Sequence, residues 1–222
     1  MRAQAKPPRR KWPWIIVGVI LAGLIAYALY AVATNKPVAQ LTPEPTVSNT
    51  TTPVDAAPTG CLGGESRDAE MLLAADAAAP HTTSGAVEFA TAYVRWMHQF
   101  PNPSADDATE AKAVFAASND DFDLVGYLAG KPNLSGGVVE DGRTFYSSTV
   151  PGVWDVESES DDKVTVSIGT AFVVDGQLSA SLRGSITVTV VWEDGGWRFE
   201  SSEGTRTTED LFSIGTGFTG GC

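Results

Sequence analysis

Residues 163–201 read KVTVSIGTAFVVDGQLSASLRGSITVTVVWEDGGWRFES, and their alternating pattern gives the clearest indication of the fold. Within this segment Val164, Val166 and Ile168 alternate with polar residues such as Thr165. An apolar residue at every second position is typical of a β-strand with one buried face. The segment therefore predicts antiparallel strands with one apolar face and one hydroxyl-rich face.

Two turns divide this region into strands. Asp175-Gly176 is a hairpin signal, and the run 193–196, Glu-Asp-Gly-Gly, is a second one. Gly169 and Gly184 fall inside strands, where glycine indicates a bulge or a bend. The pattern predicts a curved antiparallel meander with strands at 144–149, 153–158, 163–174, 177–193 and 197–201.

Helices are predicted before the strands. Phe89, Tyr93 and Met97 recur at four-residue spacing, which gives one apolar helix face, and Pro101 ends that helix. Helices followed by an antiparallel sheet form an α+β layout, in which the helices cover one face of the sheet. The predicted helices are 66–79, 84–100, 104–118 and 120–129, the first three capped by Ser66, Ser84 and Ser104.

Two cysteines bracket this region. Cys61 follows a Pro/Thr-rich segment, Cys222 is the last residue, and no cysteine lies between them. Outside the cytoplasm such a pair predicts a disulfide bond that joins the two ends of the domain. Two free thiols or an intermolecular bridge are the alternatives.

The N-terminal residues predict a membrane anchor. Residues 1–14 contain five basic residues and no acidic one, and residues 15–33 carry no charge. Nineteen uncharged residues suffice for a helix that crosses the hydrocarbon core, and the basic end is expected to stay in the cytoplasm. A cleaved signal peptide is the alternative, because Ala31-Val32-Ala33 offers a small-x-small cleavage pattern.

These features divide the chain into four parts. They are a basic cytoplasmic tail (1–14), a transmembrane helix (15–33), a Pro/Thr-rich linker (34–60) and an extracytoplasmic α+β domain (61–222). From Pro37 onward there are 9 basic and 27 acidic residues, a net charge of −18. An acidic surface repels nucleic acids, so no nucleic-acid partner is expected.

The chain has few residues suited to cofactor or metal chemistry. It contains 2 histidines, His81 and His98, and no glycine-rich phosphate loop, GxSxG elbow or HExxH helix. Acidic groups such as Asp120-Asp121-Asp123 lack the spacing of a calcium loop and are interpreted as solvated turns. The sequence therefore predicts no catalytic residue, no cofactor and no metal site.

The whole layout resembles the nuclear transport factor 2-like fold. The resemblance covers about 84–201 and rests on the order of elements and on the closing hairpin from Trp192 to Trp197-Arg198. It implies a cone-like domain of two or three helices packed on a curved antiparallel sheet. Single-pass bacterial proteins with such an exported domain include the assembly-factor subunit of type IV secretion, its counterpart in Gram-positive conjugation channels, and mammalian-cell-entry-associated membrane proteins.

The resemblance implies a non-enzymatic scaffold in the bacterial cell membrane, as a component of a conjugation or secretion machine. Its partners would be the membrane, through its own helix, and other envelope proteins, with homo-oligomerisation left open. The alternative function is an extracytoplasmic module that binds a small apolar ligand or lipid. A third, a hydrolase or isomerase, would require a carboxylate or histidine that faces into the cone.

Two sets of residues are candidates for a site. The first set is aromatic and either lines a pocket in the cone or packs the core, which is the favoured interpretation; its members are Tyr93, Trp96, Trp154, Phe172, Trp192, Trp197 and Phe199. The second set lies in the C-terminal tail and either caps the core or contacts a partner; its members are Leu211, Phe212, Ile214 and Phe218. Capping is favoured for the tail, and no inward-facing carboxylate is expected.

Overall fold

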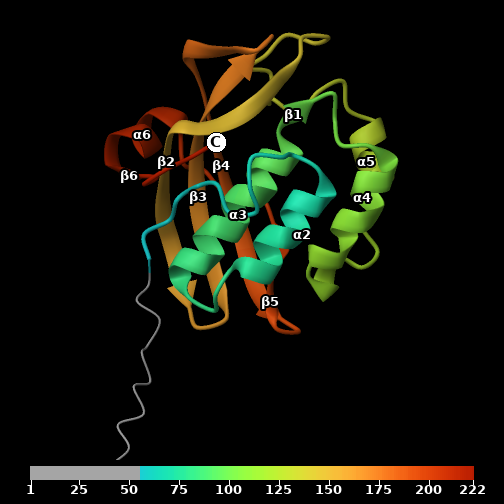
Figure 1. The fold of residues 1–222 in the computed structure, drawn as a ribbon, viewed down its shortest axis with the longest axis vertical. Helices are drawn as coiled ribbons and strands as arrows, with labels where there is room; N and C mark the ends of the chain where they lie inside the picture. Colours follow the sequence, from blue (N-terminus) through green and yellow to red (C-terminus); the bar gives the residue numbers. More distant parts are fainter. Residues whose placement is uncertain (1–55) are drawn as a thin grey trace, which may run out of the picture. The chain divides into compact units, whose positions relative to one another are not determined.

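The strands form a curled antiparallel sheet, a half-barrel, with helices on its inner side (Figure 1). The computed structural model describes residues 56–222. The sheet order is β1-β2-β3-β4-β5, and β6 pairs with β2, so the predicted α+β class and meander are confirmed. The strands are β1 (Gln99–Phe100), β2 (Phe145–Ser160), β3 (Lys163–Val174), β4 (Gln177–Glu193), β5 (Gly196–Ser201) and β6 (Thr216–Gly217).

The pairing register separates an apolar face from a hydroxyl face. Val166 lies opposite Val188, and both side chains are fully buried against the helices. On the other face Ser167 Oγ lies 2.8 Å from Thr187 Oγ1, in a pair of opposing hydroxyl groups. The alternation read from the sequence is therefore the alternation of the two sheet faces.

Strand β2 differs from the prediction of two separate strands. It runs unbroken from Phe145 to Ser160, with a register shift against β3 between Ser148 and Val153. Pro151 has no N–H for the ladder, so this part of the strand leaves β3. Instead, the Thr149 N–H donates to the Cys222 carbonyl at 3.0 Å, so the bulge receives the C-terminus of the chain.

Four of the five α-helices in residues 56–222 overlap the four predicted ranges, and the fifth, α6, was not predicted. Helices α2 and α3 begin after Asp68 and Thr82, whose side chains accept from Met71 N and Gly85 N, so the predicted caps Ser66 and Ser84 are wrong. The α-helices are α2 (Ala69–Ala78), α3 (Thr83–Met97), α4 (Ala105–Ala111), α5 (Leu124–Ala129) and α6 (Thr208–Ile214).

Three predicted helix boundaries are corrected, two by tertiary contacts and one by a local cap. Helix α3 stops at Met97 because Gln99 and Phe100 pair with β2. Helix α4 gives way at Ala111 to a short 3₁₀ turn, since Phe115 extends and bridges to β5. Helix α5 starts only at Leu124, where the preceding aspartate caps it.

The main core lies between α3 and the inner face of the sheet. Trp96, Phe89 and Leu72 from the helices are fully buried against Ile168 and Trp197 from the strands. Helix α2 lies beside α3 in the same layer, and α4 and α5 pack against each other at the margin (Figure 1). These helices cover only the inner face of the sheet, so the outer face is covered by a different segment of the chain.

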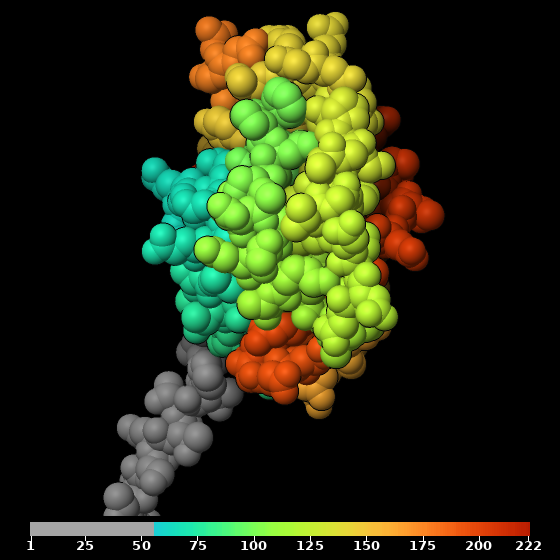
Figure 2. All heavy atoms as spheres, turned by 90° about the vertical axis from the view of Figure 1, so that its right-hand side faces the viewer, coloured from blue at the N-terminus to red at the C-terminus, as the bar shows by residue number. Residues whose placement is uncertain are grey.

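The C-terminal tail, residues 202–222, covers that far face. Helix α6 contacts β2, β3 and β4, and Arg206 pairs with Glu157 at 2.6 Å and Asp155 at 3.2 Å. In Figure 2 the tail and α2 lie at opposite margins of the molecule. The tail then pairs as β6 with β2 and reaches the N-terminal end of the domain.

The four tail residues singled out in the sequence lie in different surroundings. Leu211 is fully buried under α6, and Phe212 is partly buried beside it. Phe218 packs against the core beside Gly60, whereas Ile214 is 55% exposed. Leu211 and Phe218 therefore cap the domain, and Ile214 is the one of the four that faces solvent.

Replacing Gly169 by valine is expected to displace α6. A Cβ at this position would lie 2.9 Å from the Phe212 ring and 3.1 Å from Leu211, so the helix cannot keep its place. Trypsin should then cleave after Arg206 much faster than in the wild type. Gly217→Val is the matched control, because no atom lies within 4 Å of its Cβ position. Equal cleavage in both variants would contradict this packing.

A disulfide bond between Cys61 and Cys222 closes the domain, as predicted. The two residues are 161 positions apart in the chain, and their Cα atoms lie 5.5 Å apart. Neighbouring backbone joins the same ends, since the Thr219 N–H donates to the Pro58 carbonyl at 3.0 Å. The two ends of the described domain are therefore fastened together.

The predicted anchor does not fall within this part of the chain. The basic tail (1–14), the transmembrane helix (15–33) and most of the linker (34–60) lie outside the described residues. Among residues 56–222, the helices are too short or too polar to cross a bilayer.

Candidate functional site

One cavity of the domain is lined mainly by aromatic and apolar side chains, and we call it the aromatic cavity. It opens between the end of α3, the region of α5 and strands β4 and β5, and its volume is about 520 Å³. Its lining residues are Tyr93, Met97, His98, Phe122, Tyr127, Leu134, Ile186, Phe199, Ser202 and Glu203. Cavities of this size and character are typical of sites for small organic molecules.

Stacked aromatic rings form the wall of the aromatic cavity. The Tyr93 and Phe199 rings stack with centroids 4.0 Å apart, and Phe115 supports both from the side. At the mouth, Phe122 and Tyr127 form a tilted pair, and each is 40% exposed. The inner wall is therefore rigid and apolar, and the mouth offers two further rings to an entering molecule.

The environment of the aromatic cavity determines the protonation states of two lining residues, His98 and Tyr93. His98 Nδ1 lies 2.6 Å from the Leu134 carbonyl and donates to it, which fixes the ring orientation. Burial lowers the pKa of His98 to about 4, so the imidazole is neutral at physiological pH. Burial also raises the pKa of Tyr93 far above its ordinary value, so that its hydroxyl stays protonated.

His98 is expected to make stability depend on pH below neutrality. Its pKa is about 4 in the folded chain and 6.5 ordinarily, so unfolding takes up a proton in that window. The free energy of unfolding should therefore fall as pH drops from about 6.5 to about 4. Urea titrations of the wild type and of His98→Gln at both ends of the window test this. The variant should lose less stability, and an equal loss would contradict the assignment.

The aromatic candidates from the sequence are divided among several places. Tyr93 and Phe199 line the aromatic cavity. Trp96 and Trp197 are fully buried in the main core, and Trp154 and Trp192 pack against it at its margin. Phe172 lies in a second cluster with Val139, Phe145 and Val174, where its ring contacts the bare Gly184 backbone. Most of the set therefore packs the core.

Several residues of the aromatic cavity were missed in the sequence. Tyr127 lies in α5 and Phe122 lies just before it, and a helix of six residues is too short to show a periodic pattern in the sequence. His98 and Glu203 lie just beyond the ends of α3 and β5, where no pattern shows which way a side chain points. Glu203 is exposed and lies at the rim of this cavity, so it does not overturn the expectation that no carboxylate faces into the cone.

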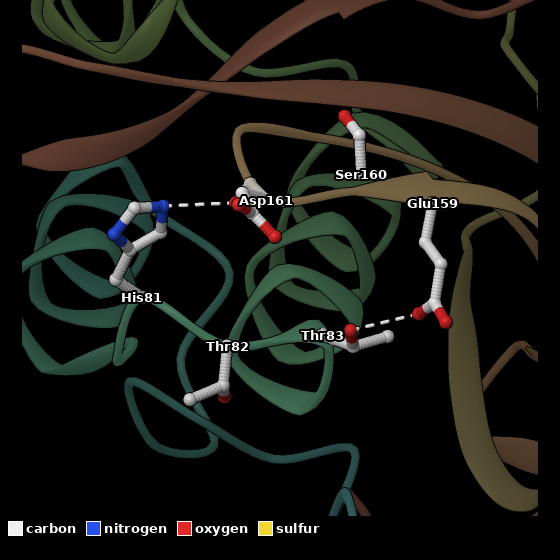
Figure 3. Close-up of a pocket in the computed structure, with 6 residues that line it drawn as sticks. All are labelled: His81, Thr82, Thr83, Glu159, Ser160 and Asp161. Atoms are coloured by element: carbon white, nitrogen blue, oxygen red, sulfur yellow. Dashed lines mark hydrogen bonds between the residues drawn. The ribbon is translucent and has the colours of Figure 1, made fainter.

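A second, more polar pocket lies beside the loop between α2 and α3 (Figure 3). His81 Nε2 lies 2.9 Å from the Asp161 carbonyl, and Thr83 Oγ1 donates to Glu159 at 2.8 Å. The His81 ring stacks on Trp192 with centroids 4.1 Å apart. These contacts join the β2–β3 turn to the start of α3, so we assign this pocket a structural role.

Residues 56–222 contain no candidate metal-binding cluster. No group of three or more His, Cys, Asp or Glu side chains there is arranged to hold a metal ion. The acidic residues Asp120 and Asp123 lie in the turn before α5, where Asp123 caps the helix.

Comparison with known proteins gives no relative of this chain: no family model, no curated protein and no solved structure matches it. Function therefore has to be argued from the residues and their geometry.

Proposed function

We propose that this chain is a single-pass protein of a bacterial cell membrane whose exported domain is a non-enzymatic scaffold. The Cys61–Cys222 bond carries the proposal, because it closes the domain directly after the linker and belongs to an oxidising compartment. A basic N-terminus and 19 uncharged residues support an anchor with the N-terminus in the cytoplasm. A conjugation or secretion machine is the assembly that the layout of the chain favours.

The start of the domain is suited to a tether. Glu88 on α3 accepts hydrogen bonds from the Thr59 hydroxyl at 2.7 Å and the Gly60 N–H at 3.1 Å. On the same helix, buried Arg95 donates to the Gly64 carbonyl at 2.7 Å. A force applied through the linker would therefore act first on these hydrogen bonds and on the disulfide bond, and only then on the packed core.

A partner surface is available on the tail. Ile214 is an exposed apolar residue at the end of α6, and β6 beside it is exposed. Because Leu211 and Arg206 hold this segment on the sheet, Ile214 is presented on an ordered surface. We assign contact with other envelope proteins, or with a second copy of the chain, to this surface.

Crosslinking in cells tests the scaffold directly. The tagged full-length chain is crosslinked, extracted in mild detergent and captured, and its partners are identified by mass spectrometry. Reproducible recovery of other envelope proteins is expected, with loss of those partners in Ile214→Asp. Leu178→Asp is the matched control, since Leu178 is 51% exposed but lies at the start of β4, opposite Val173 at the β3–β4 hairpin. A chain that comes down alone would contradict the scaffold role.

A second candidate function, binding of a small and mainly apolar molecule, is favoured by the aromatic cavity. Native mass spectrometry of the full-length chain taken from its own cells should then show a bound mass that survives purification. Enzymatic activity is not part of either proposal, because the ring of His98 is oriented by a backbone carbonyl and, within residues 56–222, by no carboxylate.

A further inference from the structure

The aromatic cavity contains one fixed donor and one fixed acceptor of hydrogen bonds. The Tyr93 hydroxyl and His98 Nε2 both belong to lining residues, and neither atom has a hydrogen-bond partner among residues 56–222. Tyr93 is 4% exposed and His98 is partly buried, and both polar atoms remain within reach of solvent. A ligand that enters the cavity can therefore replace water at both atoms.

The roles of the two atoms follow from their surroundings. His98 Nδ1 keeps its proton because it donates to the Leu134 carbonyl, so Nε2 of the neutral ring carries a lone pair and accepts. Tyr93 stays protonated because burial raises its pKa, so its O–H donates. The pair therefore matches a group that accepts one hydrogen bond and donates another.

The remaining lining excludes a negatively charged ligand. It contains no lysine and no arginine, and Glu203 contributes a carboxylate. Tyr127 and Ser202 add only neutral hydroxyl groups. Because a buried anion requires a positive partner or several donors, a carboxylate or phosphate would be poorly stabilised there.

From this geometry we propose that the aromatic cavity binds a neutral molecule with an apolar ring body and one hydroxyl group, such as a phenol or a cyclic alcohol. Its oxygen accepts from Tyr93, and its hydroxyl proton is donated to His98 Nε2. Its rings pack between Phe199 and the mouth residues Phe122 and Tyr127. This assignment rests on the second candidate function and names its ligand class.

The chain's 2 histidines allow a direct test. The full-length chain in nanodiscs is labelled with ¹³C at histidine Cε1, and the two signals are assigned with His81→Asn. Three probes of equal ring size are titrated: 2-naphthol, 2-methoxynaphthalene and 2-naphthoate, with free probe measured beside empty nanodiscs. We expect 2-naphthol to shift the His98 signal and leave His81 unchanged. The ether and the carboxylate should bind at least tenfold more weakly.

Variants separate a specific site from a general apolar surface. Tyr93→Phe should weaken 2-naphthol about tenfold and should also weaken 2-methoxynaphthalene, whose ether oxygen accepts from the Tyr93 hydroxyl too, whereas the binding of naphthalene, which has no oxygen, should stay unchanged. The unmoved His81 signal reports that the fold is intact. Equal binding of alcohol and ether, or stronger binding of 2-naphthoate, would overturn the ligand class while leaving a binding cavity in place. No response of His98 to any probe would overturn the assignment and, with no bound mass in native spectra, the second candidate function too.

Discussion

A chain in which Cys61 and Cys222 are both replaced by alanine is expected to lose about 5 kcal/mol of stability. The bond spans 161 positions, so its loss frees a loop of almost the whole domain in the unfolded state. Since domains of this size are stable by about 5–15 kcal/mol, the variant should be close to unfolded at 37 °C. Thermal and urea unfolding without reductant measure the difference.

Three comparisons make this prediction specific. Each single variant, Cys61→Ala and Cys222→Ala, should match the double variant, because one partner is enough to abolish the bond. The wild type under strong reductant should match all three. The tail contact of Thr219 with Pro58 should also loosen, so hydrogen exchange at that amide should rise first. A double variant as stable as the wild type would contradict a formed bond.

Trp197→Ala is expected to cost about 3–5 kcal/mol, the second largest effect. Trp197 is fully buried, and its indole Nε1 donates to the Pro80 carbonyl at 2.9 Å. Its ring also meets Trp192 edge-on with centroids 5.3 Å apart. Truncation would therefore leave a cavity between α2 and β5 and remove one of the two hydrogen bonds that the Pro80 carbonyl accepts, the other being donated by the Thr82 N–H.

Trp197→Phe separates packing from hydrogen bonding. Phenylalanine keeps most of the ring but cannot donate to Pro80, so we expect a loss between those of the wild type and the alanine variant. Trp192→Ala is the control for a nearby ring, and because Trp192 is only partly buried its truncation should cost less. Urea unfolding measures all three variants. A Trp197→Ala loss no larger than that of Trp192→Ala would contradict the placement of this residue.

Local patterns predicted the parts of the fold that depend on near neighbours in the chain. The period of two over 163–193 gave the strands and their buried face, because adjacent residues of a strand alternate between faces. Asp175 and Asp194 each adopt a positive φ in a tight hairpin turn, as the predicted turn signals require. The two lone cysteines predicted the bond because no third cysteine offered an alternative within the chain.

The parts that were wrong or missed depend on distant contacts. The end of α3 and the unbroken course of β2 are decided by pairing with segments far along the chain. Helix α6 carries too few residues for a periodic signal, and its place on the sheet depends on the bare backbone at Gly169. His98 belongs to the aromatic cavity because the Leu134 region folds back over it, 36 positions later.

The central claim is that this domain works outside the cytoplasm with its ends joined by a disulfide bond. Intact cells that express the full-length chain are treated with a thiol-blocking reagent, lysed, reduced and labelled with a heavy maleimide. The account predicts that both cysteines take up the label after reduction and neither takes it up without reduction. If both are blocked in the intact cells before any reduction, the thiols are free and the account is wrong.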